Sequence, residues 1–130
     1  MRAFKTRWFA RFAKREAIAD EALREAIERS ERGLIDANLG GGLIKQRVAR
    51  PGSGRSGGYR TIIAYRSGNR AVFLDGFAKN EQDNIPAEEL AELRVIAQNW
   101  LNAGPQTIRN AMENGMLLEM NYAPKNEPIG

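Results

Sequence analysis

The stretch Gly42–Asn80 decides the fold, and it reads GLIKQRVARPGSGRSGGYRTIIAYRSGNRAVFLDGFAKN. Three apolar runs in it, Leu43–Ala49, Tyr59–Tyr65 and Ala71–Phe77, alternate with connections rich in glycine and serine. Apolar runs of this length that are separated by turn residues predict antiparallel strands. We therefore expect an antiparallel sheet at the centre of the protein.

The same stretch concentrates the positive charge of the chain. No acidic residue occurs between Ala37 and Leu74, although the net charge of the whole chain is only +4. Seven basic residues lie in this interval: Lys45, Arg47, Arg50, Arg55, Arg60, Arg66 and Arg70. A sheet this basic predicts contact with a polyanion, and nucleic acid is the leading candidate.

Side chains alternate between the two faces of an extended strand, so Lys45 and Arg47 should share one face. The connection that follows them, Pro51–Gly58, contains four glycines. This composition predicts a mobile basic loop beside a basic sheet. Such a loop is either a flap that orders on a ligand or a flexible hairpin connection without that role.

The third predicted strand should also present two faces. Alternation places Val72 and Leu74 on one face and Phe73 and Phe77 on the other. The sequence Ser67–Asn69, with its central glycine, predicts a tight hairpin between the second and third strands.

Helical patterns flank the sheet on both sides. Thr6 is the expected N-cap of a short first helix, and residues 21–32 form a second amphipathic pattern. Pro86 opens the clearest helical pattern of the chain, and Gly104 followed by proline ends it. The protein is therefore expected to be α+β, with helices before and after the sheet.

The organisation of the chain follows from these elements. Arg2–Lys5 is expected to be an opening edge strand. We expect one α+β domain over residues 1–104 and a C-terminal extension over residues 105–130 that is partly loose. This extension contains a short apolar piece, Met116–Met120.

The composition narrows the possible chemistry. The chain has no cysteine and no histidine, which removes thiol nucleophiles and the commonest general base and metal ligand. Two-metal nucleases need clustered carboxylates, and the central region offers only Asp75, Glu81 and Asp83. We therefore expect no metal and no cofactor. No apolar run approaches the roughly 20 residues of a membrane helix, so a cytoplasmic protein without a membrane partner is expected.

The remaining possibility is that lysine and arginine side chains act on a phosphate group. RNA carries its own nucleophile, the 2′-hydroxyl, so an enzyme can cleave RNA without metal by positioning this group and stabilising the developing charge. Arginine matches phosphate oxygens with its planar fork, and lysine exchanges protons when neighbouring cations lower its pKa. The residues alone leave two interpretations open, catalysis of cleavage and electrostatic binding of phosphates.

Three short motifs carry a resemblance to a known family: Gly42–Val48 (GLIKQRV), Gly54–Arg60 (GRSGGYR) and Phe77–Glu81 (FAKNE). Together they resemble the RelE/HigB-like toxins of bacterial type II toxin–antitoxin systems, over about residues 2–102. The resemblance implies a small α+β fold in which N-terminal helices pack on an antiparallel sheet, followed by a C-terminal helix. It also implies an endoribonuclease (an mRNA interferase) that cuts messenger RNA on the ribosome and is neutralised by a cognate antitoxin.

The resemblance assigns catalytic positions to four residues, Lys45, Arg47, Arg60 and Lys79. We expect RNA contacts from Arg50, Arg55 and Asn80. The family's further arginine and aromatic hydroxyl are absent here, where Asn80 and Pro86 stand instead. Proton transfer is then left to Lys45, Lys79 or Glu81.

An alternative function follows from the same fold. ParE toxins resemble this family in fold but act on DNA gyrase, so fold alone does not define the target. The alternative is a non-catalytic toxin of this fold that binds nucleic acid or inhibits gyrase. Arg66 and Arg70 flank the predicted hairpin turn, away from the other cations, and we expect their replacement to affect activity only mildly.

Overall fold

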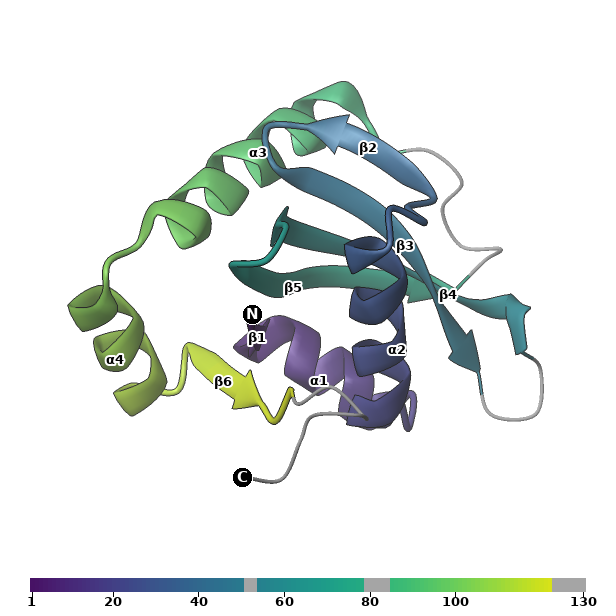
Figure 1. Cartoon of the computed structure of the whole chain (residues 1–130), viewed down its shortest axis with the longest axis horizontal. Helices are drawn as coiled ribbons and strands as arrows, with labels where there is room; N and C mark the ends of the chain where they lie inside the picture. The colour runs from purple at the N-terminus through teal and green to yellow at the C-terminus, as the bar shows by residue number, and fades with distance from the viewer. Residues whose placement is uncertain (51–53, 79–84, 123–130) are drawn as a thin grey trace.

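The computed structural model of the protein describes residues 1–50, 54–78 and 85–122 (Figure 1). Its elements in chain order are β1 (Arg2–Thr6), α1 (Arg7–Arg15), α2 (Asp20–Glu31), β2 (Ala37–Gly40), β3 (Leu43–Arg50), β4 (Gly54–Arg66), β5 (Arg70–Ala78), α3 (Ala87–Asn102), α4 (Pro105–Glu113) and β6 (Leu117–Met120). The six strands form one sheet in the order β2-β3-β4-β5-β1-β6. The expected α+β class is confirmed, although the sheet is mixed because β1 runs parallel to β5.

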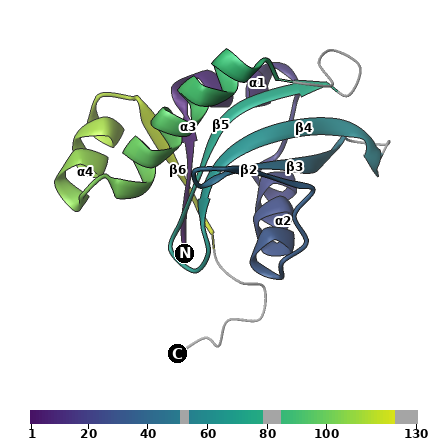
Figure 2. The same cartoon turned by 90° about the horizontal axis from the view of Figure 1, so that it is seen from above.

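Helices cover both faces of the sheet, and each face buries its own apolar layer. In Figure 2 the sheet separates α2 from α3. One layer joins α1 and α2 to the sheet through Phe9, Leu23, Ile27, Ile63 and Phe73. The other layer joins α3 and α4 to the opposite face through Leu43, Ile62, Val72, Leu101 and Ile108. We call this second face the α3 face, after the helix that packs on it. The basic residues described below also lie on this face.

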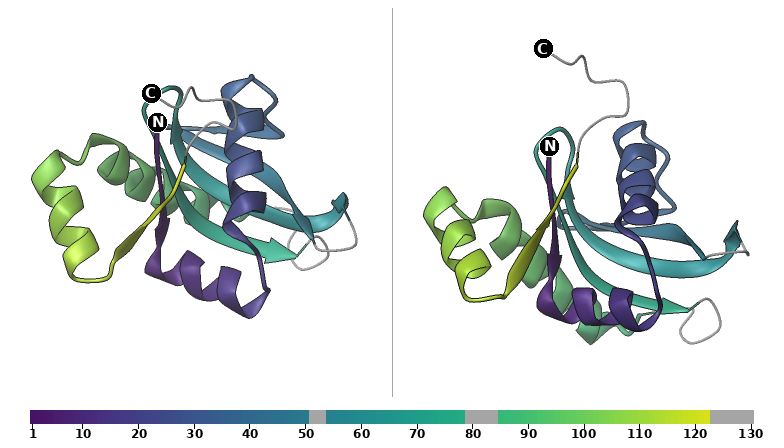
Figure 3. Two further views of the ribbon diagram at one scale, coloured as in Figure 1. Left: turned by 60° about the horizontal axis from the view of Figure 1, so that its bottom comes forward. Right: turned by 90° about the horizontal axis from the view of Figure 1, so that it is seen from below.

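The first strand is not an edge strand, and this expectation from the sequence is wrong. β1 lies between β5 and the C-terminal strand β6, with Ala3 opposite Met120 (Figure 3). Leu117 and Met120 are buried. The apolar C-terminal piece is therefore the outer strand of the same sheet, and β1 can be buried because β6 pairs with its free edge.

Several boundaries agree with the sequence signals. The Thr6 hydroxyl accepts a hydrogen bond from the Phe9 amide at 3.2 Å and caps α1 as expected. Helix α3 begins directly after Pro86. The predicted loop Pro51–Gly58 differs from the structure, because β4 already begins at Gly54. Its first residues, 51–53, lie outside the described residues.

A register shift in β5 changes the face of every later side chain. Ile63 pairs with Phe73, whereas Ile62 pairs with Asp75, so Leu74 is an extra residue in β5. An extra residue of this kind is a β-bulge, and it breaks strict alternation. Phe77 therefore lies on the α3 face with Leu74, and the predicted separation of these two residues is wrong.

The carboxylate of Glu31 connects the β4–β5 hairpin to α2 through hydrogen bonds. Glu31, the last residue of α2, accepts hydrogen bonds from the Tyr65 hydroxyl, the Ser67 hydroxyl at 3.0 Å and the Gly68 amide at 3.0 Å. Burial raises the pKa of Glu31, but the bonds from Tyr65, Gly68 and Ser67 outweigh it and leave the pKa below its ordinary value. Burial and the Glu31 bond together raise the pKa of Tyr65 to about 12.

Glu31→Gln should lower the free energy of unfolding by about 1 kcal/mol at pH 7, because the donors of Tyr65, Ser67 and Gly68 lose a charged acceptor. The pKa of Glu31 is lower in the folded state, so this stability is present above the unfolded pKa and is lost as pH falls through the folded pKa. The free energies of unfolding of the two proteins, measured in urea, should converge as the pH falls below the folded pKa of Glu31. Glu92→Gln, an exposed position on α3, serves as the control, and equal effects of the two variants at pH 7 would refute this role of Glu31.

Candidate functional site

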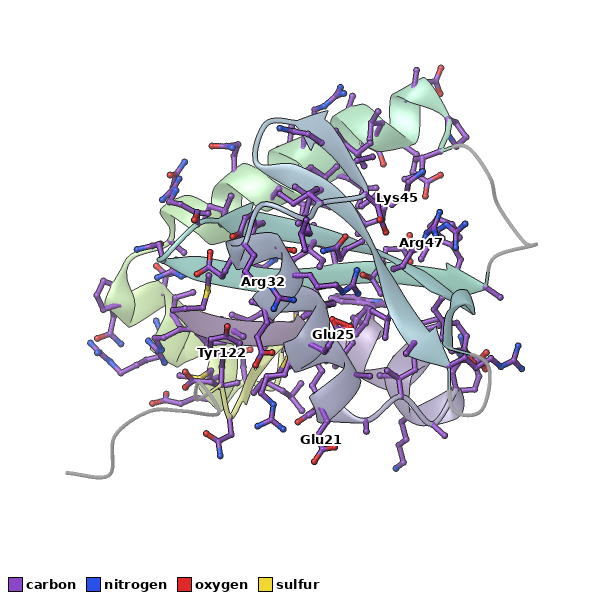
Figure 4. All side chains as sticks on the ribbon, turned by 45° about the vertical axis from the view of Figure 1, so that its right-hand side comes forward. Glu21, Glu25, Arg32, Lys45, Arg47 and Tyr122 are labelled. Carbon is purple, nitrogen blue, oxygen red and sulfur yellow. The ribbon has the colours of Figure 1, made fainter. Side chains whose placement is uncertain are left out.

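The pairing register brings three of the predicted cations onto the α3 face. Lys45 pairs with Ile62, and Arg47 pairs with Arg60. Residues that are directly opposite in an antiparallel pair project to the same side of the sheet, and Ile62 belongs to the apolar layer beneath α3. Lys45, Arg47 and Arg60 therefore share this face, and Figure 4 shows Lys45 and Arg47 close together along β3.

Two arginines face each other across β3 and β4 at this site. Like charges directly opposite on neighbouring strands destabilise a sheet. Asp36 forms an ion pair with one member of this pair, with its Oδ2 3.7 Å from the Arg47 Nε. Within the described parts of the chain, Nη1 of Arg60 is buried and donates to no acceptor. A buried donor without a partner lowers the stability of the fold. The same donor is available to bind an anion.

The backbone of β3 is held in place by a buried amide on the opposite face. Gln46 is fully buried, and its Nε2 donates to Ser30 Oγ at 3.0 Å and to the Leu34 carbonyl at 2.8 Å. Its Oε1 accepts from the Asp36 amide at 3.1 Å. The sequence indicates this network, because Gln46 lies between Ile44 and Val48 on an apolar strand face. A buried polar side chain there must form hydrogen bonds.

Asp36 and Arg29 fix the next residue, Arg47, through its backbone. The Arg47 amide donates to Asp36 Oδ2 at 2.7 Å. The buried guanidinium of Arg29 on α2 donates to the Arg47 carbonyl and pairs with Glu25. The strand that carries Lys45 and Arg47 is thus clamped to α2, so the two cations are presented from a rigid element.

Gln46→Leu should lower the free energy of unfolding by about 2–4 kcal/mol, because it leaves several buried partners unpaired without creating a cavity. Thermal unfolding checks this expectation. Gln106→Leu, at an exposed position on α4, is the matched control and should change stability by less than about 0.5 kcal/mol. A similar small effect at both positions would show that the network does not hold β3.

The remaining predicted site residues are distributed as follows. Arg50 ends β3, and its guanidinium lies 5.6 Å from the ring centre of Tyr59. Arg55 lies in β4. Lys79 and Asn80 lie outside the described residues, so their predicted roles stay predictions.

Arg66 and Arg70 lie at the other end of the hairpin and bind the end of α3. Arg66 donates to the Leu101 carbonyl at 2.9 Å, and Arg70 donates to the carbonyls of Trp100 and Ala103 at 2.8 and 2.9 Å. Cations at a helix C-terminus satisfy carbonyls that lack intrahelical partners. Both residues therefore have a structural task, and activity assays need other control positions.

Asp75 was not predicted as a member of this site. It pairs with Ile62, which in turn pairs with Lys45, so Asp75 also projects to the α3 face. Strict alternation along β5 groups Asp75 with Phe73 on the other face, and only the bulge at Leu74 brings it here. Burial raises the pKa of Asp75, its bond from the Gly76 amide opposes this, and the charge of Glu89 adds to the rise.

Two other features are absent from residues 1–50, 54–78 and 85–122. In these ranges no group of three or more His, Cys, Asp or Glu side chains is placed to hold a metal ion. None of the helices in the same ranges combines the length and the hydropathy needed to span a bilayer.

Fold and site together define a small α+β protein that gathers arginine and lysine side chains on one sheet face. The family model of the RelE toxin of the RelE/RelB toxin–antitoxin system matches residues 1–120. The chain therefore belongs to the RelE toxin family, and it is the toxin of a toxin–antitoxin system. The resemblance found in the three motifs is confirmed, and the match extends through β6. No curated protein sequence matches the chain.

Proposed function

We propose that the protein is a ribosome-dependent messenger-RNA endonuclease that uses the 2′-hydroxyl of RNA as nucleophile. Lys45, Arg47 and Arg60 bind the scissile phosphate and stabilise the charge that develops on it. Lys79 belongs to the same proposal on the resemblance alone. Arg50, Arg55 and Asn80 bind neighbouring phosphates, the ribosome and messenger RNA are the target in the cytoplasm, and the cognate antitoxin is the inhibitor.

The facing pair Arg47 and Arg60 supports this proposal most directly. A sheet gains no stability from two opposed arginines, and a buried nitrogen of Arg60 has no hydrogen-bond partner among the described residues. A phosphate between them would receive donors from two planar guanidinium groups, the geometry in which arginine binds phosphate oxygens best. Members of this family are generally endoribonucleases, which agrees with this use of the site.

Inducible expression in bacteria, followed by mapping of transcript 5′ ends, tests the proposed activity. New 5′ ends with a three-nucleotide phase relative to the reading frame are expected, because the ribosome presents codons in register. Intact transcripts together with DNA damage would instead support gyrase inhibition. Intact transcripts without DNA damage would leave a nucleic-acid-binding toxin without catalysis.

A further inference from the structure

The strand register places Asp75 on the same sheet face as Lys45, Arg47 and Arg60. Its backbone position is diagonal to Arg60 across β4 and β5, which corresponds to a separation of about 7–8 Å. Lys45 lies two strands away in the same row, at about 10 Å. Side chains from these three positions can therefore converge on one ribose–phosphate unit.

In the described residues, one of the two carboxylate oxygens of Asp75 accepts a hydrogen bond. Its Oδ1 accepts a hydrogen bond from the Gly76 amide at 2.9 Å. Among residues 1–50, 54–78 and 85–122, no lysine or arginine forms an ion pair with Asp75, and no donor binds its Oδ2. Within the described residues, this half-buried carboxylate thus has one oxygen that accepts no hydrogen bond.

The surroundings of Asp75 increase its basicity. Burial raises its pKa, the Gly76 amide opposes the rise, and the negative charge of Glu89 on α3 adds to it. The charged groups on the elements of this face include Lys45, Arg47 and Arg60 of the sheet, Glu88, Glu89, Glu92 and Arg94 of α3, and Arg109 and Glu113 of α4. A carboxylate with a raised pKa accepts a proton more readily than an ordinary aspartate, which suits a general base.

We propose that Asp75 is a catalytic residue that accepts the proton of the attacking 2′-hydroxyl, an inference that rests on the endonuclease function proposed above. The 2′-oxygen forms a bond to phosphorus and its proton passes to Asp75. The bond between phosphorus and the 5′-oxygen breaks, and Lys45 donates a proton to the leaving oxygen. The products are a 2′,3′-cyclic phosphate and a 5′-hydroxyl, and Asp75 and Lys45 regain their charges by proton exchange with water.

Single-turnover cleavage of messenger RNA on purified ribosomes tests the role of Asp75. Asp75→Asn should reduce the cleavage rate by about a hundredfold or more, while binding to the ribosome is retained. Asp75→Glu should restore part of the rate, because it returns a carboxylate. Glu113→Gln, an exposed position on α4, removes a carboxylate elsewhere and should leave the rate unchanged.

The pH profile separates catalysis from a structural role. The wild-type rate should fall on the acidic side as Asp75 takes up a proton, and the residual rate of Asp75→Asn should lack this fall. Glu89→Gln should move the acidic fall to lower pH, because it removes the neighbouring negative charge. This second variant keeps the test decisive even if Asp75→Asn does not fold.

The outcomes distinguish the two proposals. If the wild type cleaves but Asp75→Asn stays within threefold of it with the same acidic fall, the role of Asp75 is overturned and the endonuclease stands. An acidic fall that Glu89→Gln does not move also overturns it. A wild-type protein that cleaves no messenger overturns both.

Discussion

Arg60→Ala should abolish messenger-RNA cleavage without destabilising the protein. Removing a donor that stabilises transition-state charge costs a factor of about a hundred to a thousand in rate. The same substitution removes one member of a like-charged pair and a buried nitrogen that has no partner in residues 1–50, 54–78 and 85–122, so the melting temperature should be unchanged or higher. Lost activity together with retained or increased stability is typical of a functional residue.

Two further variants define what Arg60 contributes. Arg60→Lys keeps the charge but loses the planar fork, and it should recover only part of the rate. Arg32→Ala removes one positive charge directly after the end of α2, a helix that packs on the other sheet face, and it should leave cleavage nearly unchanged. Equal, small losses of cleavage rate in Arg60→Ala and Arg32→Ala would show that only the net charge of the protein matters. Electrostatic binding of phosphates would then be the remaining role of Arg60.

Gly58→Ala should have the largest effect on folding. A Cβ atom at Gly58 would lie 2.1 Å from the Val48 carbonyl oxygen and 3.1 Å from the Arg50 amide nitrogen. Both are backbone atoms of β3, so no flexible side chain can move aside to relieve the clash. We expect a loss of about 3 kcal/mol or more, which corresponds to a fall in melting temperature of roughly 10 °C.

Gly104→Ala is the matched control for this prediction. A Cβ atom at Gly104 would meet nothing within 4 Å, so the change should cost less than about 1 kcal/mol. If Gly58→Ala melts like Gly104→Ala, the close approach of β3 and β4 at the register shift is wrong. The same close contact accounts for a glycine directly before Tyr59 in this chain.

The central strands could be predicted from local signals. Apolar runs between glycine-rich turns located β3, β4 and β5, and alternation correctly placed Lys45 and Arg47 on one face. Both signals depend on residues that are close in sequence. The helix caps at Thr6 and Pro86 were visible for the same reason.

The remaining features depend on contacts between distant parts of the chain. The burial of β1 requires β6, and Ala3 and Met120 are far apart in sequence. The bulge at Leu74 arises from the pairing of β5 with β4, and no residue type in the strand marks it. Because the bulge moves Asp75 and Phe77 to the α3 face, alternation alone could not assign a carboxylate to the site.

Cleavage of a ribosome-bound messenger tests the proposed endonuclease activity. A messenger positioned on purified ribosomes is incubated with wild-type protein or with Arg60→Ala, and the cleavage products are mapped by primer extension and their ends identified. We predict cleavage within the ribosome-bound codon by the wild type only, with 2′,3′-cyclic phosphate and 5′-hydroxyl ends, and no cleavage of free messenger. Messenger that stays intact with the folded wild-type protein bound to the ribosome would contradict the proposed endonuclease.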